Sequence, residues 1–280
     1  MSYLFCNDDS ALRSVPIYHL ERAIGRTSLS HGVKLSPEED LDRAADQIQD
    51  NGLSEFCWSL YFEPSFILRL LYAGFLPICT DLGAPNDPVF CLLPKLHEER
   101  CVVFPNRFHV HSKTRKRASR FSLSLDSHFD AVVEGCMQQH GTRSWLYRPL
   151  LNALRDLQSG KAKRPLNCPV SVHSVELWNS EGKLVAGEIG YCVGSIYTSM
   201  TGFHTESGSG SIQLAALAGL LFKVLKFTVW DLGMSMDYKL AMGAELIPRR
   251  DWIRLVRDHR QDPRSLQCDQ STNCRQLIDS

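Results

Sequence analysis

The stretch from Trp230 to Trp252 reads WDLGMSMDYKLAMGAELIPRRDW. The apolar run Lys226–Trp230 leads into it and predicts a strand that carries Asp231 at its C-terminal end. We expect a short helical turn next, then Gly243-Ala244, and then a Pro-Arg-Arg segment, residues 248–250, that opens a last helix. Folds that mix helices and strands often place their chemistry at strand ends before turns. Asp231 is therefore the first candidate for a functional residue.

The composition is that of an ordinary globular protein. Of the 280 residues, 44% are hydrophobic and 22% are charged, so the chain can form one large domain or two modest ones. Lys plus Arg and Asp plus Glu each number 31, which gives a formal net charge of zero. A polyanion must therefore be held by a local basic patch rather than by the field of the whole protein.

The ten cysteines are scattered, and no Cys-x-x-Cys pair occurs. This pattern predicts buried free thiols in a reducing compartment rather than a disulfide scaffold or a structural zinc site. His109 and His111 lack a third ligand nearby, so we expect no metal and no cofactor.

The N-terminal residues 1–16 contain Asp8 and Asp9 and lack a long apolar core, which does not fit a signal peptide. No window reaches the length of a membrane span. We expect a cytoplasmic, monomeric protein with no membrane partner.

Helix signals are clearest in the first half of the chain. Ser36 before Pro37, with Glu39 three residues on, forms a capping box, and Asn51-Gly52 is a stop signal. The sequence predicts helices over 36–50, 64–73, 127–140 and 149–158, a loop with short extended pieces over 77–94, and a short strand over 101–104.

The second half is richer in strands. Alternating apolar residues predict a hairpin, and a polar edge inside a long apolar stretch that includes Gln213 predicts a buried helix. The expected elements are strands over 172–178, 183–193 and 195–200, a helix over 212–225, and a polar, frayed segment after Arg260.

The order of these elements predicts an α+β protein. We expect an N-terminal extension over 1–35 and a small, mainly helical lobe with a basic segment over 36–160. An antiparallel-sheet lobe with packed helices should follow over 170–258, and a polar tail over 259–280.

Several motifs resemble those of the leucyl/phenylalanyl-tRNA–protein transferase family, in the family's order. The 230–252 stretch resembles its Asp-x-Gln, Leu-Gly-Ala and Ile-Pro-Arg-Arg signature, and His173–Trp178 resembles its His-Ser-Ile-Glu-Val-Trp strand. Weaker matches are Phe75-Leu76-Pro77, Val133–Cys136 and Ser144-Trp145-Leu146, so the resemblance runs from about residue 36 to 257.

The resemblance implies a GNAT-like second lobe. It also implies transfer of an amino acid, chiefly Leu or Phe, from aminoacyl-tRNA to the N-terminal α-amine of a protein that begins with Lys or Arg, which marks that protein for degradation. Asp231 matches the family's catalytic Asp, and Trp145 matches a Trp that contacts the terminal adenosine. The alternative for Asp231 is a carboxylate that caps the following turn.

The chain departs from the family at three positions. Gly233 replaces a Gln, Met200 stands near a family Glu, and Ile78 replaces a second Trp. Glu188 stands where the family has an apolar pocket residue, and we take it as a second catalytic candidate. We expect Tyr197, Phe203 and Phe222 to line the pocket for the amino-acid side chain, with plain core aromatics as the alternative.

A basic segment runs from Arg107 to Arg120 without any acidic residue. The family carries a basic cluster here that meets the tRNA acceptor stem, and the usual alternative is a solvated face. Phosphate groups are bound by such clusters of cations. The candidate tRNA-binding residues are Lys113, Arg115, Lys116 and Arg117, together with Trp145.

Two other functions remain open. The loop Ser207–Gly210 before a helix is compatible with an acyl-CoA-dependent N-acyltransferase that binds pyrophosphate through backbone N–H groups. Gly233, Met200 and Ile78 favour a non-catalytic descendant that still binds aminoacyl-tRNA or a protein N-terminus.

Overall fold

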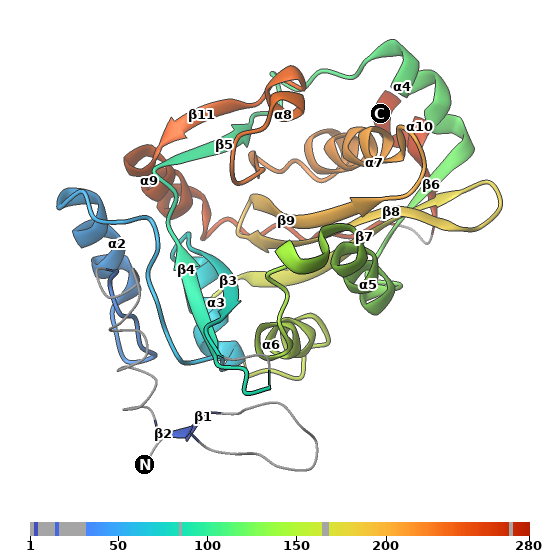
Figure 1. The fold of residues 1–280 in the computed structure, drawn as a ribbon. Coiled ribbons are helices and arrows are strands. Elements are labelled where there is room, and N and C mark those ends of the chain that lie inside the picture. The colour runs from blue at the N-terminus through green and yellow to red at the C-terminus, as the bar shows by residue number, and fades with distance from the viewer. Residues whose placement is uncertain (1–2, 5–14, 17–31, 84–85, 164–167, 269–270) are drawn as a thin grey trace. The chain divides into compact units, whose positions relative to one another are not determined.

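The computed structural model describes residues 3–4, 15–16, 32–83, 86–163, 168–268 and 271–280. The chain forms two compact units, one of residues 1–98 with 145–168 and one of residues 99–144 with 169–280 (Figure 1). The units are discontinuous, whereas the expected lobes follow one another along the chain. Residues 99–144, which include the basic segment, belong to the second unit.

The first unit combines helices with a hairpin. Its helices are α2 (Leu41–Asp50), α3 (Pro64–Tyr72) and α6 (Arg148–Gln158), and its hairpin pairs β3 (Leu76–Asp81) with β4 (Phe90–Lys95). The short strands β1 (Tyr3–Leu4) and β2 (Val15–Pro16) pair with each other. The predicted helices over 64–73 and 149–158 are confirmed.

Two predictions for this unit are correct only in part. The first helix begins at Leu41 because Asp40, not Ser36, is its N-cap and accepts from the N–H groups of Asp42 and Arg43. The expected loop over 77–94 is largely the β3–β4 hairpin. Asp81 closes its turn by accepting from Gly83 and Val89, a local side-chain contact that composition does not reveal.

The second unit is built on an eight-stranded sheet in the order β11-β5-β10-β9-β8-β7-β6-β12. Its neighbouring strands are antiparallel except β9 and β10, which are parallel. A helix connects these two strands, as a parallel pair requires. The strands are β5 (Glu99–Val103), β6 (Phe121–Leu125), β7 (Val170–Asn179), β8 (Leu184–Val193), β9 (Ile196–His204), β10 (Val229–Asp231), β11 (Glu245–Pro248) and β12 (Thr272–Asn273).

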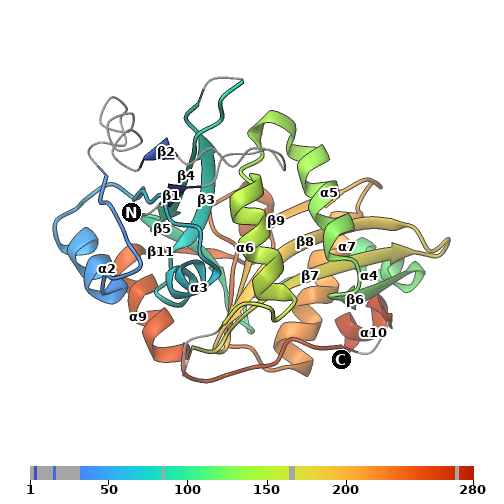
Figure 2. The same cartoon turned by 90° about the horizontal axis from the view of Figure 1, so that it is seen from below.

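Helices cover both faces of this sheet (Figures 1 and 2). On one face lies α5 (Phe129–His140), and on the other lies α7 (Ser209–Ala218), which continues as a π-helical turn over Gly219–Val224. Smaller helices are α4 (Ser112–Arg117), α8 (Asp237–Ala241), α9 (Arg249–His259) and α10 (Cys274–Asp279). The α+β class and the hairpin predicted over 172–193 are confirmed.

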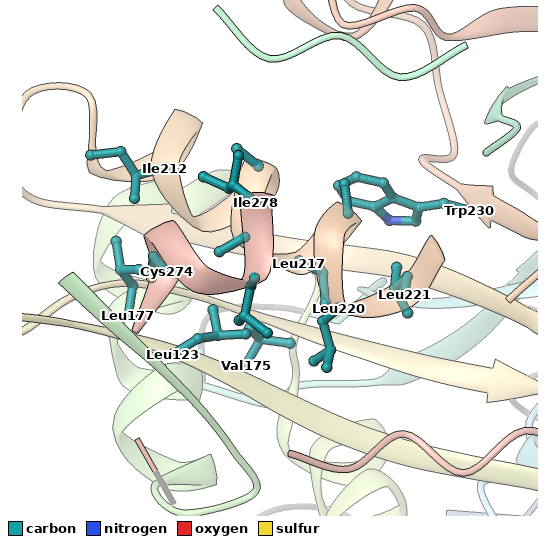
Figure 3. Packing of buried hydrophobic residues seen from close by; sticks show 14 of the residues in the cluster. Leu123, Val175, Leu177, Ile212, Leu217, Leu220, Leu221, Trp230, Cys274 and Ile278 are labelled. Atoms are coloured by element: carbon teal, nitrogen blue, oxygen red, sulfur yellow. The ribbon is translucent and has the colours of Figure 1, made fainter. Parts of the chain in front are cut away.

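The core of the second unit lies between the α7 helix and the sheet. Strand residues such as Leu123, Val175 and Leu177 pack against Leu217 and Leu220 (Figure 3). Burial of these side chains is the main favourable term for this part of the fold.

The expectation of a frayed C-terminal tail is wrong. Strand β12 pairs with β6 at the edge of the sheet, and α10 buries Cys274, Leu277 and Ile278 in the core. These residues have the i, i+3, i+4 spacing of one helix face, although the segment around them is polar. Their burial supplies the stabilisation that the composition of the tail does not suggest.

The predicted free thiols are confirmed for the nine cysteines that the structure describes, since each of them is free. Seven of the nine are buried, and burial raises the pKa of the Cys91 and Cys136 thiols to about 12. Across the described ranges, no helix has the length and apolar character that a membrane span requires.

Candidate active site

Asp231 lies at the end of β10, as the sequence predicts, and forms a buried ion pair with Arg100 of β5. Arg100 Nε lies 2.9 Å from Asp231 Oδ1, and Arg100 Nη2 lies 2.8 Å from Oδ2. Both side chains are 0% exposed. Burial lowers the pKa of Arg100, but the Asp231 carboxylate and the Tyr191 side chain together outweigh that effect and raise the pKa overall. The guanidinium also lies 4.7 Å from the ring centroid of Trp252 in α9.

The same ion pair fixes the turn that follows the strand. Asp231 Oδ1 accepts the N–H of Gly233 at 2.8 Å, and Gly233 has a φ of +71°, a conformation that favours glycine. Lys239 Nζ closes the turn from the other side by donating to the carbonyls of Leu232 and Met234. Burial lowers the pKa of Lys239. Asp231 is thus a component of a rigid turn rather than an exposed carboxylate.

Glu188 on β8 is also buried, and three side chains donate to it. Tyr197 Oη at 2.8 Å and Ser199 Oγ at 2.6 Å both donate to Oε1, and Gln213 Nε2 of α7 donates to Oε2 at 3.0 Å. Ser199 Oγ in turn accepts a hydrogen bond from Trp230 Nε1 at 2.9 Å. Ser199 is half-buried, whereas Glu188 is only 3% exposed. The half-buried Ser199 therefore links the buried side chains of Glu188 and Trp230 through its hydroxyl.

Burial raises the pKa of Glu188, and the bonds from Ser199, Gln213 and Tyr197 offset only part of that effect. The folded state therefore binds a proton to Glu188 more tightly than the unfolded state does. We expect the unfolding free energy of the wild type to rise, relative to Glu188→Gln, as the pH falls from the raised pKa towards the ordinary value of about 4.3. Urea titrations of both proteins between pH 4 and 8 measure this difference; two parallel curves would contradict it.

The structure does not bring the two predicted catalytic carboxylates together. Asp231 of β10 is paired with Thr198 of β9. Glu188 instead accepts hydrogen bonds from Tyr197 and Ser199, the residues immediately before and after Thr198. Because consecutive strand side chains point to opposite faces, Asp231 and Glu188 lie on opposite faces of the sheet.

The three predicted pocket aromatics are also divided between the faces. Tyr197 and Phe222 belong to the core cluster beneath α7. The ring centroids of Phe222 and Trp230 are 6.5 Å apart. Phe203 lies against α5, where a Cβ added to Gly135 would come within 2.7 Å of its ring. The three rings therefore do not line a single pocket.

Met200, one of the departures from the family pattern, lies at a break in strand pairing. Ile189 is paired with Thr201 and Gly190 with Ser199, so Met200 has no partner in β8. This is a β-bulge, which redirects the side chains on either side of it. The bulge places Ser199 and Gly202 on the same face as Glu188.

The predicted tRNA-binding cations lie on or near the six-residue helix α4 and differ in their surroundings. Lys113 and Lys116 are exposed, whereas Arg117 Nη2 donates to the carbonyl of Ser207 at 2.7 Å. Arg115 Nη1 lies 3.2 Å from Asp279 Oδ1 of α10. Trp145 belongs to the first unit and is half-buried.

The loop Ser207–Gly210 is the start of α7. Gly208 has a φ of +80°, and the hydroxyl of Ser209 is buried and bonds to the carbonyls of Val185 and Glu206. The carbonyl of Ser207 accepts a hydrogen bond from Arg117. These contacts are those of a helix start held in place by its neighbours.

Sequence reasoning missed Arg100, Ser199 and Lys239 as members of the site. Arg100 is separated from Asp231 by 131 positions, and no local pattern links the two. Ser199 had a weak signal, because its alternation with Tyr197 on a predicted strand places both side chains on one face. Within the described residues, no group of three or more His, Cys, Asp or Glu side chains is arranged to hold a metal ion.

Comparison with known proteins identifies the relatives of the chain. A sequence profile described as leucyl/phenylalanyl-tRNA protein transferase matches residues 102–257, more than half of the chain. The enzyme of that name from Desulforapulum autotrophicum is 30% identical over 179 residues, which cover 62% of this chain and 72% of the relative. The enzyme from Shewanella baltica is 26% identical, and the match covers 72% of this chain and 79% of the relative. The enzyme from Psychrobacter arcticus is 25% identical, and the match covers 88% of this chain and 85% of the relative.

Two solved structures are distantly similar to the chain. A probable N-acyltransferase from Enterococcus faecalis has a TM-score of 0.36 at 10% identity and covers 76% of this chain and 50% of its own. The L-PGS structure from Bacillus licheniformis has a TM-score of 0.37 at 13% identity. The match covers 78% of this chain and 76% of the L-PGS chain.

The profile match and the enzymes that share its description define the class as an aminoacyl-transferring enzyme. The chain belongs to the leucyl/phenylalanyl-tRNA–protein transferase family.

Proposed function

We propose that this protein transfers an amino acid with a Leu- or Phe-like side chain from aminoacyl-tRNA to the N-terminal α-amine of another protein. The observation that carries the proposal is the family match over residues 102–257, which contains the strands β6 to β10 and the Asp231 turn. We further propose that the acceptor begins with Lys or Arg, that the product is marked for degradation, and that the reaction takes place in the cytoplasm.

The chemistry is an acyl transfer. The neutral amine attacks the ester carbonyl, a C–N bond forms, the bond to the ribose oxygen breaks, and the tRNA leaves as its hydroxyl. An α-amine has a pKa of about 7.7–8.0, so part of it is neutral at cellular pH. The protein then needs to align the two substrates and to accept one proton.

Glu188 is the proposed proton acceptor, acting through Ser199. The hydroxyl of the half-buried Ser199 takes the proton from the attacking amine and passes its own to Glu188 Oε1, 2.6 Å away. Glu188 returns that proton by the same route to the ribose oxygen as the ester bond breaks. The raised pKa of Glu188 supports this role, because a base is most effective when its pKa approaches the working pH.

Asp231 is proposed as a positioning residue. Its carboxylate is engaged by Arg100 and by the N–H of Gly233, so it orients the Leu232–Met234 turn instead of exchanging protons with a substrate. This role differs from that of a catalytic group, and it follows from the complete burial of the ion pair.

Aromatic residues are proposed for two separate contacts with the aminoacyl-tRNA, one on each unit. Tyr197 and Phe222 share one core cluster and are the proposed wall for the amino-acid side chain, whereas Phe203 lies on the other face of the sheet. Trp145 is the proposed stacking partner of the terminal adenosine, an assignment that rests on the family resemblance alone.

Lys113 and Lys116 are the proposed primary contacts for tRNA phosphates. Both are exposed on α4, so reversing their charges in Lys113→Glu/Lys116→Glu should lower tRNA affinity at least tenfold. The slope of log affinity against log salt concentration should also become less steep, by the amount expected for the loss of about two phosphate contacts. Filter binding at several NaCl concentrations measures both quantities. Unchanged affinity would remove α4 from the tRNA site.

The proposed activity is tested by mixing the purified protein with a pool of radiolabelled aminoacyl-tRNAs and peptides that begin with Arg, Lys, Asp or Glu. Transfer of label to a peptide with an N-terminal Arg or Lys supports the proposal and identifies the donor amino acid. Salt-sensitive tRNA binding without any transfer would instead indicate a binding protein that has lost the chemistry.

A further inference from the structure

The C-terminal helix α10 lies beyond residue 257, where the family match ends, yet it is integrated into the second unit. It packs against α7 and α4. Its backbone comes so close to α7 that a Cβ added to Gly219 would lie 2.0 Å from the carbonyl oxygen of Leu277. Lys223 Nζ also donates to the carbonyl of Ile278 at 2.6 Å. The helix is therefore firmly seated next to the basic segment.

Two arginines converge on a single carboxylate where α10 meets α4. Arg115 Nη1 lies 3.2 Å from Asp279 Oδ1, and Arg275 Nε bonds to Asp279 Oδ2. Arg275 Nη1 donates in addition to the carbonyl of Arg115 at 3.0 Å, which ties the two helices together. The three side chains are 38–43% exposed, so solvent and a large ligand can reach them.

Two guanidinium groups around one oxyanion form an arrangement that also binds phosphate, because the planar N–H donors match carboxylate and phosphate oxygens alike. Asp279 is the last residue of α10, where a negative charge interacts unfavourably with the helix dipole. Within α10 it is held by the i,i+4 ion pair with Arg275, and Arg115 of α4 is its second cationic partner. The hydrogen bond from Arg275 lowers the pKa of Asp279, so the carboxylate remains charged at neutral pH.

We infer that Arg115 and Arg275 form a binding site for a phosphodiester of the tRNA backbone, and that Asp279 occupies this site in the free protein as an internal competitor. The site lies beside the exposed Lys113 and Lys116, so α10 enlarges the cationic surface of α4. A phosphate and this carboxylate compete for the two guanidinium groups, so the phosphate contact forms in only part of the wild-type complexes and forms fully once the charge of Asp279 is removed. This inference rests on the proposed function, since it specifies how the same nucleic acid is held.

The test uses the full-length protein and uncharged tRNA, with the affinity measured between 50 and 200 mM NaCl. Asp279→Asn keeps the shape of the side chain and removes its charge, so the arginines become free to bind phosphate. Each added phosphate contact makes the affinity fall about three- to fourfold more over this salt range. We expect Asp279→Asn to bind more tightly at 50 mM salt and to show this steeper dependence.

A second variant assigns the gain to the proposed site. Asp279→Asn combined with Arg275→Gln should lose the added affinity and return to the salt dependence of the wild type. Glu181→Gln is the matched control, because Glu181 is an exposed carboxylate paired with Lys183 in the β7–β8 turn and its loss changes the net charge by the same amount. The thermal unfolding of each variant confirms that α10 remains folded.

The outcomes separate this inference from the proposed function. If Asp279→Asn binds tRNA as the wild type does, or if Glu181→Gln raises the affinity equally, the phosphate site is refuted while tRNA binding through Lys113 and Lys116 stands. A gain that persists after Arg275→Gln also refutes it. If the wild type fails to bind tRNA at any salt concentration, both the inference and the proposed function are overturned.

Discussion

Replacing Asp231 with alanine is expected to lower the free energy of unfolding by about 3–5 kcal/mol. The substitution leaves the guanidinium of Arg100 fully buried without its carboxylate, and it releases the N–H of Gly233. An uncompensated buried charge is among the most destabilising changes in a protein interior. Urea denaturation followed by the fluorescence of Trp230 and Trp252, both buried near the ion pair, measures the loss.

The double variant Arg100→Met/Asp231→Leu separates the effect of the charge from that of packing. Hydrophobic replacement of a whole buried ion pair is often neutral or stabilising, so this variant should recover most of the lost stability. A loss below 1 kcal/mol in Asp231→Ala would show that the pair does not hold the turn. Recovery of stability without recovery of aminoacyl transfer would support the positioning role, because the Leu232–Met234 turn would then lack its anchor.

The largest expected effect on activity is at the Ser199–Glu188 pair. Ser199→Ala and Glu188→Gln should each lower the rate of transfer by about 10²–10⁴, the usual contribution of general base catalysis. Ser199→Ala removes the relay, and Glu188→Gln removes the proton acceptor. Because the two residues act as one unit, the double variant should be no slower than either single variant. Single-turnover assays with radiolabelled aminoacyl-tRNA measure these rates.

Tyr197→Phe is the matched control for this pair, because it removes only the hydroxyl and keeps the ring that is proposed to line the amino-acid pocket. It removes one donor to Glu188 Oε1 but leaves the bond from Ser199, so the transfer rate should change little. The wild-type rate should fall on the acid side at a higher pH than an ordinary carboxylate would give, because the pKa of Glu188 is raised by burial. Additive losses in the double variant, or a strong effect of Tyr197→Phe, would contradict the relay.

Local sequence patterns predicted much of the secondary structure. The α5 and α6 helices, the β7–β8 hairpin and the position of Asp231 at a strand end follow from periodicity and turn residues in windows of ten to fifteen residues. Errors arose where one side chain decided the outcome, as with Asp40 in place of Ser36 at the start of α2.

Long-range contacts explain the other errors. The C-terminal segment is polar in composition, and it folds because Leu277 and Ile278 fit beneath α7. The hydrophobic gain depends on a surface formed by distant residues, which the segment itself does not encode.

The sequence by itself determined the α+β class, the family and the presence of Asp231, Glu188 and a basic segment. The tertiary structure alone decided how these residues are used. It paired Asp231 with Arg100, surrounded Glu188 with three donors, and placed Asp279 between Arg115 and Arg275. The physical reason is that burial and charge pairing depend on distances in space between residues far apart in the chain, whereas propensity and periodicity act between neighbours.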